Sequence, residues 1–113
     1  MRITVDANIL VRAAIRPSGP AGAVFEIGAL PDHRLVLSRP MLTELRRVLG
    51  YERIRRLSGI TPDEAEEFVT FLFTLAEIVE IHDIPAVCSD PDDDIVVATA
   101  VAGHADVLCT LVE

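Results

Sequence analysis

The chain has 113 residues, 50% of them apolar and 25% charged, a composition typical of one globular domain with a packed core. Its formal net charge of -8 at pH 7 argues against a general nucleic-acid-binding surface. No apolar run reaches the ~18 residues of a membrane span, and Asp6 interrupts the N-terminus before a signal peptide could form. We therefore expect a cytoplasmic protein with no membrane contact.

The basic residues are unusual in kind and in position. All ten are arginines, and five of them lie between residues 46 and 56. The planar guanidinium group suits phosphate oxygens, so this segment could contact a phosphate backbone, with Arg46 and Arg47 as the candidates. The alternative is a solvated helix face, and the sequence leaves both readings open.

The first twelve residues combine a strand, an acid and a helix. Ile3, Thr4 and Val5 are β-branched and predict a short buried strand. Asp6 follows directly, and residues 7–14 have the pattern of a helix. Asp6 either caps this helix or lies with other groups at the carboxyl edge of a sheet, where such proteins bind ligands.

Strands and helices alternate along the rest of the chain. Strands are predicted at residues 35–37, 78–81 and 106–109, and helices at 21–30, after Ser38, within 50–59, from Thr61 and at 95–102. The helix at 21–30 is expected to carry Val24, Ile27 and Leu30 on one side. Ser38 is a predicted N-cap, and Gly103 a helix stop. The alternation predicts an α/β fold with a parallel sheet between helices.

The two firmest helix signals stand in the middle of the chain. Thr61 and Glu64 form a capping box with a proline between them, at the first helical position. The helix that follows Ser38 is expected to bury a stripe of Leu42, Leu45 and Leu49. Glu44 lies on the flank of that stripe, as either a plain surface residue or a side chain reaching toward the end of the sheet.

Four aspartates fall within residues 90–94, at the start of the predicted helix 95–102. The helix dipole stabilises one or two carboxylates by ~0.3–1 kcal/mol each. It does not account for four, because like charges this close repel one another. The cluster therefore indicates a cation nearby.

Three separated acidic positions are expected to converge. Asp6 follows the first strand, Glu44 lies in the helix after the second, and Asp93, with Asp90, begins the helix after the third. Right-handed crossovers bring the carboxyl ends of parallel strands to one edge. Clustered carboxylates suit Mg²⁺ or Mn²⁺, whereas the histidines lack zinc-ligand spacing. Such a site indicates metal-dependent hydrolysis of a nucleic-acid backbone.

Four motifs in the same order resemble the PIN domain family, in particular VapC-like ribonucleases, the toxin components of toxin–antitoxin pairs. The motifs span nearly the whole chain and are ITVDANIL at 3–10, LSRPMLTELRRVL at 37–49, DPDDDIVVATA at 90–100 and ADVLCT at 105–110. The resemblance implies a three-layer α/β/α sandwich and RNA cleavage that depends on Mg²⁺ or Mn²⁺. It also implies a cognate antitoxin protein and a homodimer as partners.

The resemblance assigns roles to individual residues. It makes Asp6, Glu44 and Asp93 metal ligands and catalytic residues, with Asp90 as a supporting acid. Asn8 would orient Asp6, and Glu44 would also help to position the attacking water. The spacing before Ala100 favours Asp93 over Asp94.

The end of the chain departs from the family pattern. Thr110 is followed by Leu111 and by Val112, which stands where the family has a fourth acid, and Glu113 comes one position late. We therefore expect a C-terminally truncated member that lacks the last strand and leaves a sheet edge exposed.

Two other classes of protein are alternatives to a ribonuclease. A degenerate PIN-like module would bind RNA or a partner without cutting, which Val112 favours. A phosphotransfer domain is disfavoured, because Asn8 replaces the second aspartate of a dehalogenase-type phosphatase and the chain has no lysine for a receiver domain.

Overall fold

The computed structural model describes residues 1–82 and 91–110, with Val24 and residues 91–93 described by their backbone alone. Within these ranges the elements run β1 (Arg2–Val5), α1 (Ala7–Ile15), α2 (Pro20–Gly28), β2 (Arg34–Ser38), α3 (Arg39–Leu49), α4 (Glu52–Ser58), α5 (Pro62–Leu75), β3 (Glu77–Val79), α6 (Pro91–Ala102) and β4 (Val107–Cys109).

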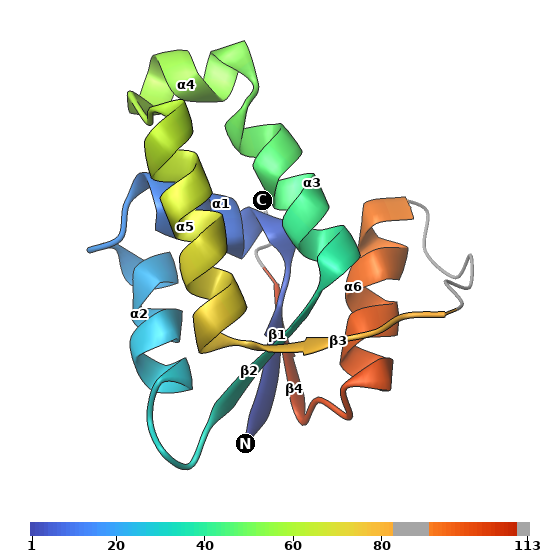
Figure 1. The fold of residues 1–113 in the computed structure, drawn as a ribbon. Helices are drawn as coiled ribbons and strands as arrows, with labels where there is room; N and C mark the ends of the chain where they lie inside the picture. Colours follow the sequence, from blue (N-terminus) through green and yellow to red (C-terminus); the bar gives the residue numbers. More distant parts are fainter. Residues whose placement is uncertain (83–90, 111–113) are drawn as a thin grey trace.

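The four described strands form one parallel sheet in the order β3-β2-β1-β4. Helix α6 packs against β1 and β2 on one face, while α2 and α3 contact β2 and α5 contacts β3 on the other (Figure 1). Helix α1 packs against α2 and α3. The predicted α/β/α arrangement with a parallel sheet is confirmed.

The two faces of the sheet differ in chemistry. Leu35 and Leu37 of β2 are fully buried in the main apolar core, with Leu10, Leu45 and Leu72 from the helices. Alternation along the strand turns Val36 and Ser38 toward α6 instead. The face under α6 is thus the one that carries buried polar groups.

Most local predictions are confirmed. Thr61 and Glu64 form both hydrogen bonds of the capping box, and the predicted leucine stripe of α3 is buried. Helix α2 ends at Gly28, before the expected Leu30. Ile27 and Leu30 are both about half exposed, whereas Phe25 packs edge-on against Phe68. The side chain of Val24, also predicted on this side, lies outside the described residues. Strand β3 also begins one residue earlier and ends two earlier than expected.

Gly103 does end α6, but for a reason other than the one expected. The residue with a left-handed backbone is His104, with φ of 52°. Gly103 instead allows α6 to approach the sheet: a Cβ at this position would lie 2.3 Å from Val36 Cγ1. The helix end therefore needs glycine for lack of space.

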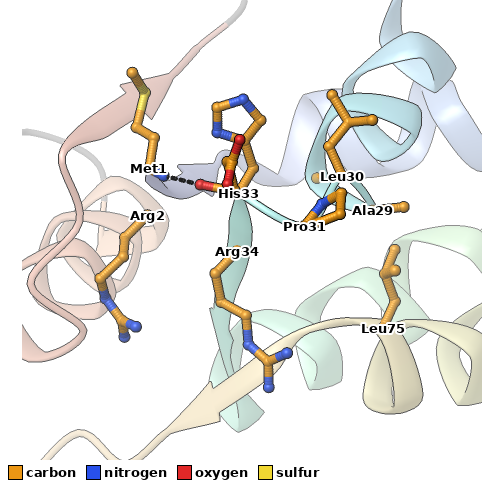
Figure 2. Close-up of a pocket in the computed structure, with 10 residues that line it drawn as sticks. Met1, Arg2, Ala29, Leu30, Pro31, His33, Arg34 and Leu75 are labelled. Carbon is orange, nitrogen blue, oxygen red and sulfur yellow. Dashed lines mark hydrogen bonds between the residues drawn. The ribbon is translucent and has the colours of Figure 1, made fainter.

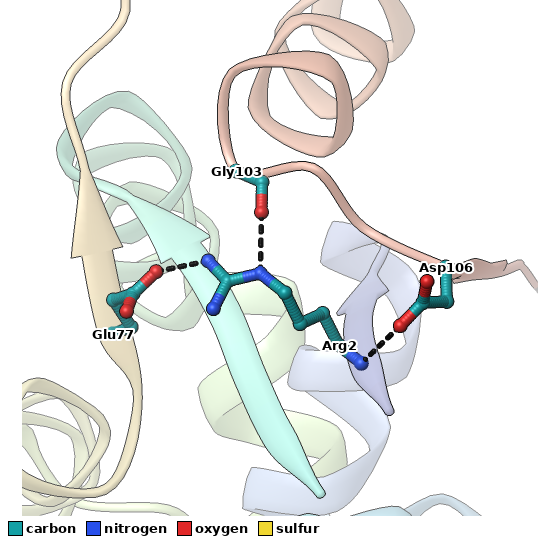
Figure 3. A network of polar contacts seen from close by, with 4 residues as sticks. All are labelled: Arg2, Glu77, Gly103 and Asp106. Atoms are coloured by element: carbon teal, nitrogen blue, oxygen red, sulfur yellow. Dashed lines mark hydrogen bonds and ion pairs between the residues drawn. The ribbon is translucent and has the colours of Figure 1, made fainter.

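Arg2 ties four segments together at the amino-terminal edge of the sheet (Figure 3). Its side chain crosses from β1 to β3 and pairs with Glu77, and its Nε donates to the Gly103 carbonyl oxygen at 2.6 Å. Its backbone N–H donates to Asp106 Oδ2 at 2.8 Å. These contacts fix the end of α6 and the start of β4 against β1.

No helix among the described residues is long and apolar enough to cross a membrane.

Candidate active site at the carboxyl edge of the sheet

The carboxyl edge of the sheet is built by β1, β2, α3 and α6. Helix α6 runs antiparallel to the strands: Thr99 lies beside Ser38 at the end of β2, and Gly103 lies beside Val36. The first turn of α6 consequently lies beyond the carboxyl edge. Its last residue, Asp94, stands five residues before Thr99, which is about 7.5 Å along the helix axis at 1.5 Å per residue. Helix α3 begins at the same edge and contacts α6.

Asp6 stands where β1 leaves the sheet. Its backbone N–H donates to the Cys109 carbonyl oxygen at 3.0 Å, which continues the pairing of β1 with β4. Its Oδ1 accepts from Ile9 N at 2.9 Å, so Asp6 is the N-cap of α1. The same carboxylate lies at the carboxyl edge of the sheet, where α/β proteins bind ligands.

Ser38 and Thr99 form a buried hydroxyl pair beneath this edge. Their oxygens lie 2.7 Å apart and both residues are fully buried. The Thr99 hydroxyl donates to the Ile95 carbonyl oxygen, so Ser38 is the donor between the two. Ser38 was predicted to cap α3; it does occupy the N-cap position, but its side chain makes no capping hydrogen bond.

Glu44 is held by an arginine of its own helix. Arg47 Nη2 lies 2.6 Å from Glu44 Oε1 and 2.5 Å from Oε2, and Arg47 Nε lies 3.1 Å from Oε2. The Glu44 side chain is only 16% exposed. It is therefore a largely enclosed carboxylate whose two oxygens both accept hydrogen bonds from the same guanidinium.

Asp94 is the buried acid of the α6 first turn. Its exposed fraction is 5%, which is rare for a carboxylate. The ligand predicted from the sequence is Asp93, whose side chain lies outside the described residues, as does all of Asp90. Burial of Asp94 follows from the packing of α6 against β1 and β2, which the run of aspartates does not reveal.

The other predicted site residues differ in their exposure and in their contacts. Asn8 is exposed in the first turn of α1. Arg46 forms an ion pair with Glu66 of α5 at 2.7 Å. Among the described side chains, which exclude those of residues 83–93 and 111–113, no three from His, Cys, Asp or Glu are close enough to hold a metal ion. The expected ligand set thus has the right oxygen chemistry, and part of it lies outside the described side chains.

A cavity of about 470 Å³ lies at the opposite, amino-terminal edge, between the start of β1 and the segment after α2. Figure 2 shows Met1, His33 and Arg34 around it. The Met1 amino group donates to the Asp32 carbonyl oxygen. Most of its lining comes from the segment that joins α2 to β2, so the acids at the carboxyl edge do not face it.

Comparison with protein families decides the identity of the fold. A family model described as PIN domain matches residues 2–111. This chain belongs to the PIN domain family. The PIN domain match covers all four motifs that carried the resemblance, so the family assignment made from the sequence is confirmed.

Comparison with solved structures agrees with this PIN fold. A chain of the structure described as VapBC2 from Rickettsia felis, bound to a DNA fragment from their promoter, superposes with a TM-score of 0.67. It shares 14% sequence identity, and the match covers 99% of this PIN domain and 100% of that chain. At this identity the likeness concerns the fold. A search of curated proteins finds no match.

Proposed function

We propose that this PIN domain is a metal-dependent ribonuclease and the toxin of a toxin–antitoxin pair. Membership of the family supports a nuclease. The observation that carries the proposal is the burial of Asp94 in the first turn of α6, beyond the edge where Asp6 leaves β1. An acid enclosed at this edge of the sheet stands where a hydrolytic metal centre would use a carboxylate.

The proposed ligands are Asp6, Glu44 and Asp93, with Asp90 in support. Asp94 is an additional candidate because its side chain is enclosed in the first turn of α6. Carboxylate oxygens are the ligands that Mg²⁺ and Mn²⁺ prefer. When bound, such an ion would supply an activated water and stabilise charge on a phosphodiester oxygen.

The chain's own residues have separate tasks in this proposal. Glu44, which is enclosed and flanked by an arginine, orients the attacking water and can accept its proton. Asn8 orients Asp6. Arg46 and Arg47 contact the substrate phosphates through guanidinium groups that are about half exposed.

The partners follow from the family and the structural neighbour. The neighbour is described as a VapBC pair bound to promoter DNA. By analogy we propose a protein antitoxin as the partner of this chain, a homodimer as its own state, single-stranded RNA as its substrate and the cytoplasm as its location.

A second candidate function is a PIN module that binds RNA or its partner without cleavage. Val112 stands where the family has its fourth acid, and it lies outside the described residues. If this acid is required, the remaining carboxylates hold a metal too weakly for catalysis.

A cleavage assay on a single-stranded RNA with Mn²⁺ separates the two functions. Substitution of Asp6 by Asn or of Glu44 by Gln should lower the rate by about 100-fold or more, because the lost metal contact stabilises the transition state by several kcal/mol. Asp63→Asn, at an exposed position in the first turn of α5, is the matched control and should retain the wild-type rate. RNA binding without cleavage by the folded wild type would favour the second function.

The same assay assigns the third ligand. Asp93→Asn and Asp94→Asn are compared at equal Mn²⁺, with folding checked by circular dichroism. Loss of cleavage in Asp93→Asn alone supports the ligand chosen from the family spacing. Loss in Asp94→Asn alone transfers that role to the buried acid.

A further inference from the structure

The Glu44–Arg47 ion pair occupies a carboxylate that the proposed function assigns to a metal. Three nitrogen–oxygen distances of 2.5–3.1 Å join the guanidinium to both carboxylate oxygens. The two residues stand three positions apart on α3, so they project from the same side of the helix. Arg47 Nη2 therefore occupies the position between the two oxygens at which a cation would bind both of them.

The two members of this pair differ in exposure. The Glu44 side chain is 16% exposed, whereas that of Arg47 is 58% exposed. The guanidinium also lies over the Tyr51 ring, at 5.9 Å from its centroid. Arg47 is thus the solvent-facing member, and it has an aromatic contact one helical turn further on that does not depend on Glu44.

We propose that Arg47 and a divalent cation compete for the Glu44 carboxylate. This inference rests on the proposed metal site. Arg47 acts as a positioning residue: its positive charge and its hydrogen bonds hold Glu44 in place when no metal is bound, and a bound cation displaces them. The Tyr51 contact keeps the displaced guanidinium at the edge of the site.

The energetics favour exchange over permanent blocking. An arginine that is more than half exposed forms a weak ion pair with its partner, because water screens the charges. A divalent ion held by several carboxylates gains more than one such pair, and its charge repels the guanidinium. Arg47 should therefore weaken metal binding without preventing it. The displaced guanidinium then suits the phosphate of an RNA backbone bound beside the metal.

The test is calorimetric titration of the full chain with Mn²⁺. Arg47→Gln should bind Mn²⁺ about three- to fivefold more tightly than the wild type, the factor expected when an exposed ion pair no longer competes. Arg47→Lys, which keeps the charge but loses the two-pronged contact, should lie between them. Arg56→Gln is the matched control, because Arg56 pairs with Glu52 on α4 outside the proposed site, and its loss should leave Mn²⁺ affinity unchanged.

A thermal melt supplies a second readout that does not involve activity. Without metal, Arg47→Gln should melt below the wild type, since Glu44 loses its partner. Saturating Mn²⁺ should raise its melting temperature by more than that of the wild type, because at a given Mn²⁺ concentration the stabilisation grows as the logarithm of the affinity.

Each outcome has a distinct meaning. If Glu44→Gln loses Mn²⁺ binding while Arg47→Gln binds as the wild type or more weakly, the competition is wrong and the metal site stands. If neither the wild type nor Arg47→Gln binds Mn²⁺, the proposed metal function fails and the competition fails with it.

Discussion

Ser38 Oγ lies 2.7 Å from Thr99 Oγ1, and this hydrogen bond joins the last residue of β2 to the middle of α6 across 61 positions of sequence. Both residues are fully buried. The bond holds α6 at a set position relative to the carboxyl edge. It thereby sets where the first turn of α6, with Asp94, lies relative to Asp6.

Removal of either hydroxyl should lower the free energy of unfolding. Ser38→Ala should lower the free energy of unfolding by about 1 kcal/mol, and Thr99→Val by about 1–3 kcal/mol, because it leaves the buried Ser38 hydroxyl without a partner. The double variant should cost less than the sum of the two. Urea denaturation of the four proteins measures the coupling. Strictly additive effects would show that the two hydroxyls do not interact.

Thr4 offers the opposite case on the same face of the sheet. Its hydroxyl is buried and makes no hydrogen bond with the described part of the chain. Thr4→Val keeps the shape and removes the unsatisfied group, so we expect a gain in unfolding free energy of about 1 kcal/mol. Denaturant unfolding measures the free energy of unfolding of Thr4→Val and of Thr99→Val, in which a paired hydroxyl is removed. A loss of stability in Thr4→Val would reveal a partner for this hydroxyl.

Gly103 should tolerate no side chain while Val36 faces it. Gly103→Ala would place a Cβ 2.3 Å from Val36 Cγ1 and should destabilise the fold by about 1–3 kcal/mol through overpacking. In the Val36→Ala background the same change should cost much less. Gly28→Ala, where the added Cβ would meet Leu35 Cβ at an ordinary 3.5 Å, is the control and should be nearly neutral by chemical melt. An equal cost in both Val36 backgrounds would place the strain elsewhere.

The Arg2–Glu77 pair predicts a dependence of stability on pH. The hydrogen bond from Arg2 lowers the pKa of the Glu77 carboxyl below its ordinary value. A carboxyl whose pKa is lower in the folded state stabilises the fold above its unfolded pKa, and this contribution disappears as the pH falls through the folded value. The wild type should therefore exceed Glu77→Gln in stability at pH 7. The difference should begin to shrink as the pH falls below about 4 and should vanish once the pH is below the lowered pKa of the folded state.

Melting temperatures across pH 2–8 measure this difference. Glu67→Gln, at an exposed position on α5, controls for the general loss of one negative charge. At the lowest pH the ion pair is absent from both the wild type and Glu77→Gln. If the melting temperature of Glu77→Gln were still lower by the same amount, the cause would be lost packing.

The order of the elements could be derived from the sequence because the signals are local. The β-branched run at residues 3–5, the capping box at Thr61 and the leucine stripe of α3 all depend on neighbours within a turn or two. The alternation of strands and helices predicted the parallel sheet and its carboxyl edge as the candidate site, and the family motifs added the expected roles of individual residues. The Glu44–Arg47 pair was also within reach, because its three-residue spacing is a local pattern.

Packing between distant segments decided the rest. The Ser38 hydroxyl bonds with Thr99 instead of capping its own helix, Gly103 is needed because Val36 approaches it, and Ile27 is exposed although it follows the helical pattern. Burial of Asp94 is of the same kind. Composition and spacing determined which acids and helices the chain has. Only the tertiary structure decided which of them are enclosed and paired, because burial depends on surfaces contributed by residues far away in the sequence.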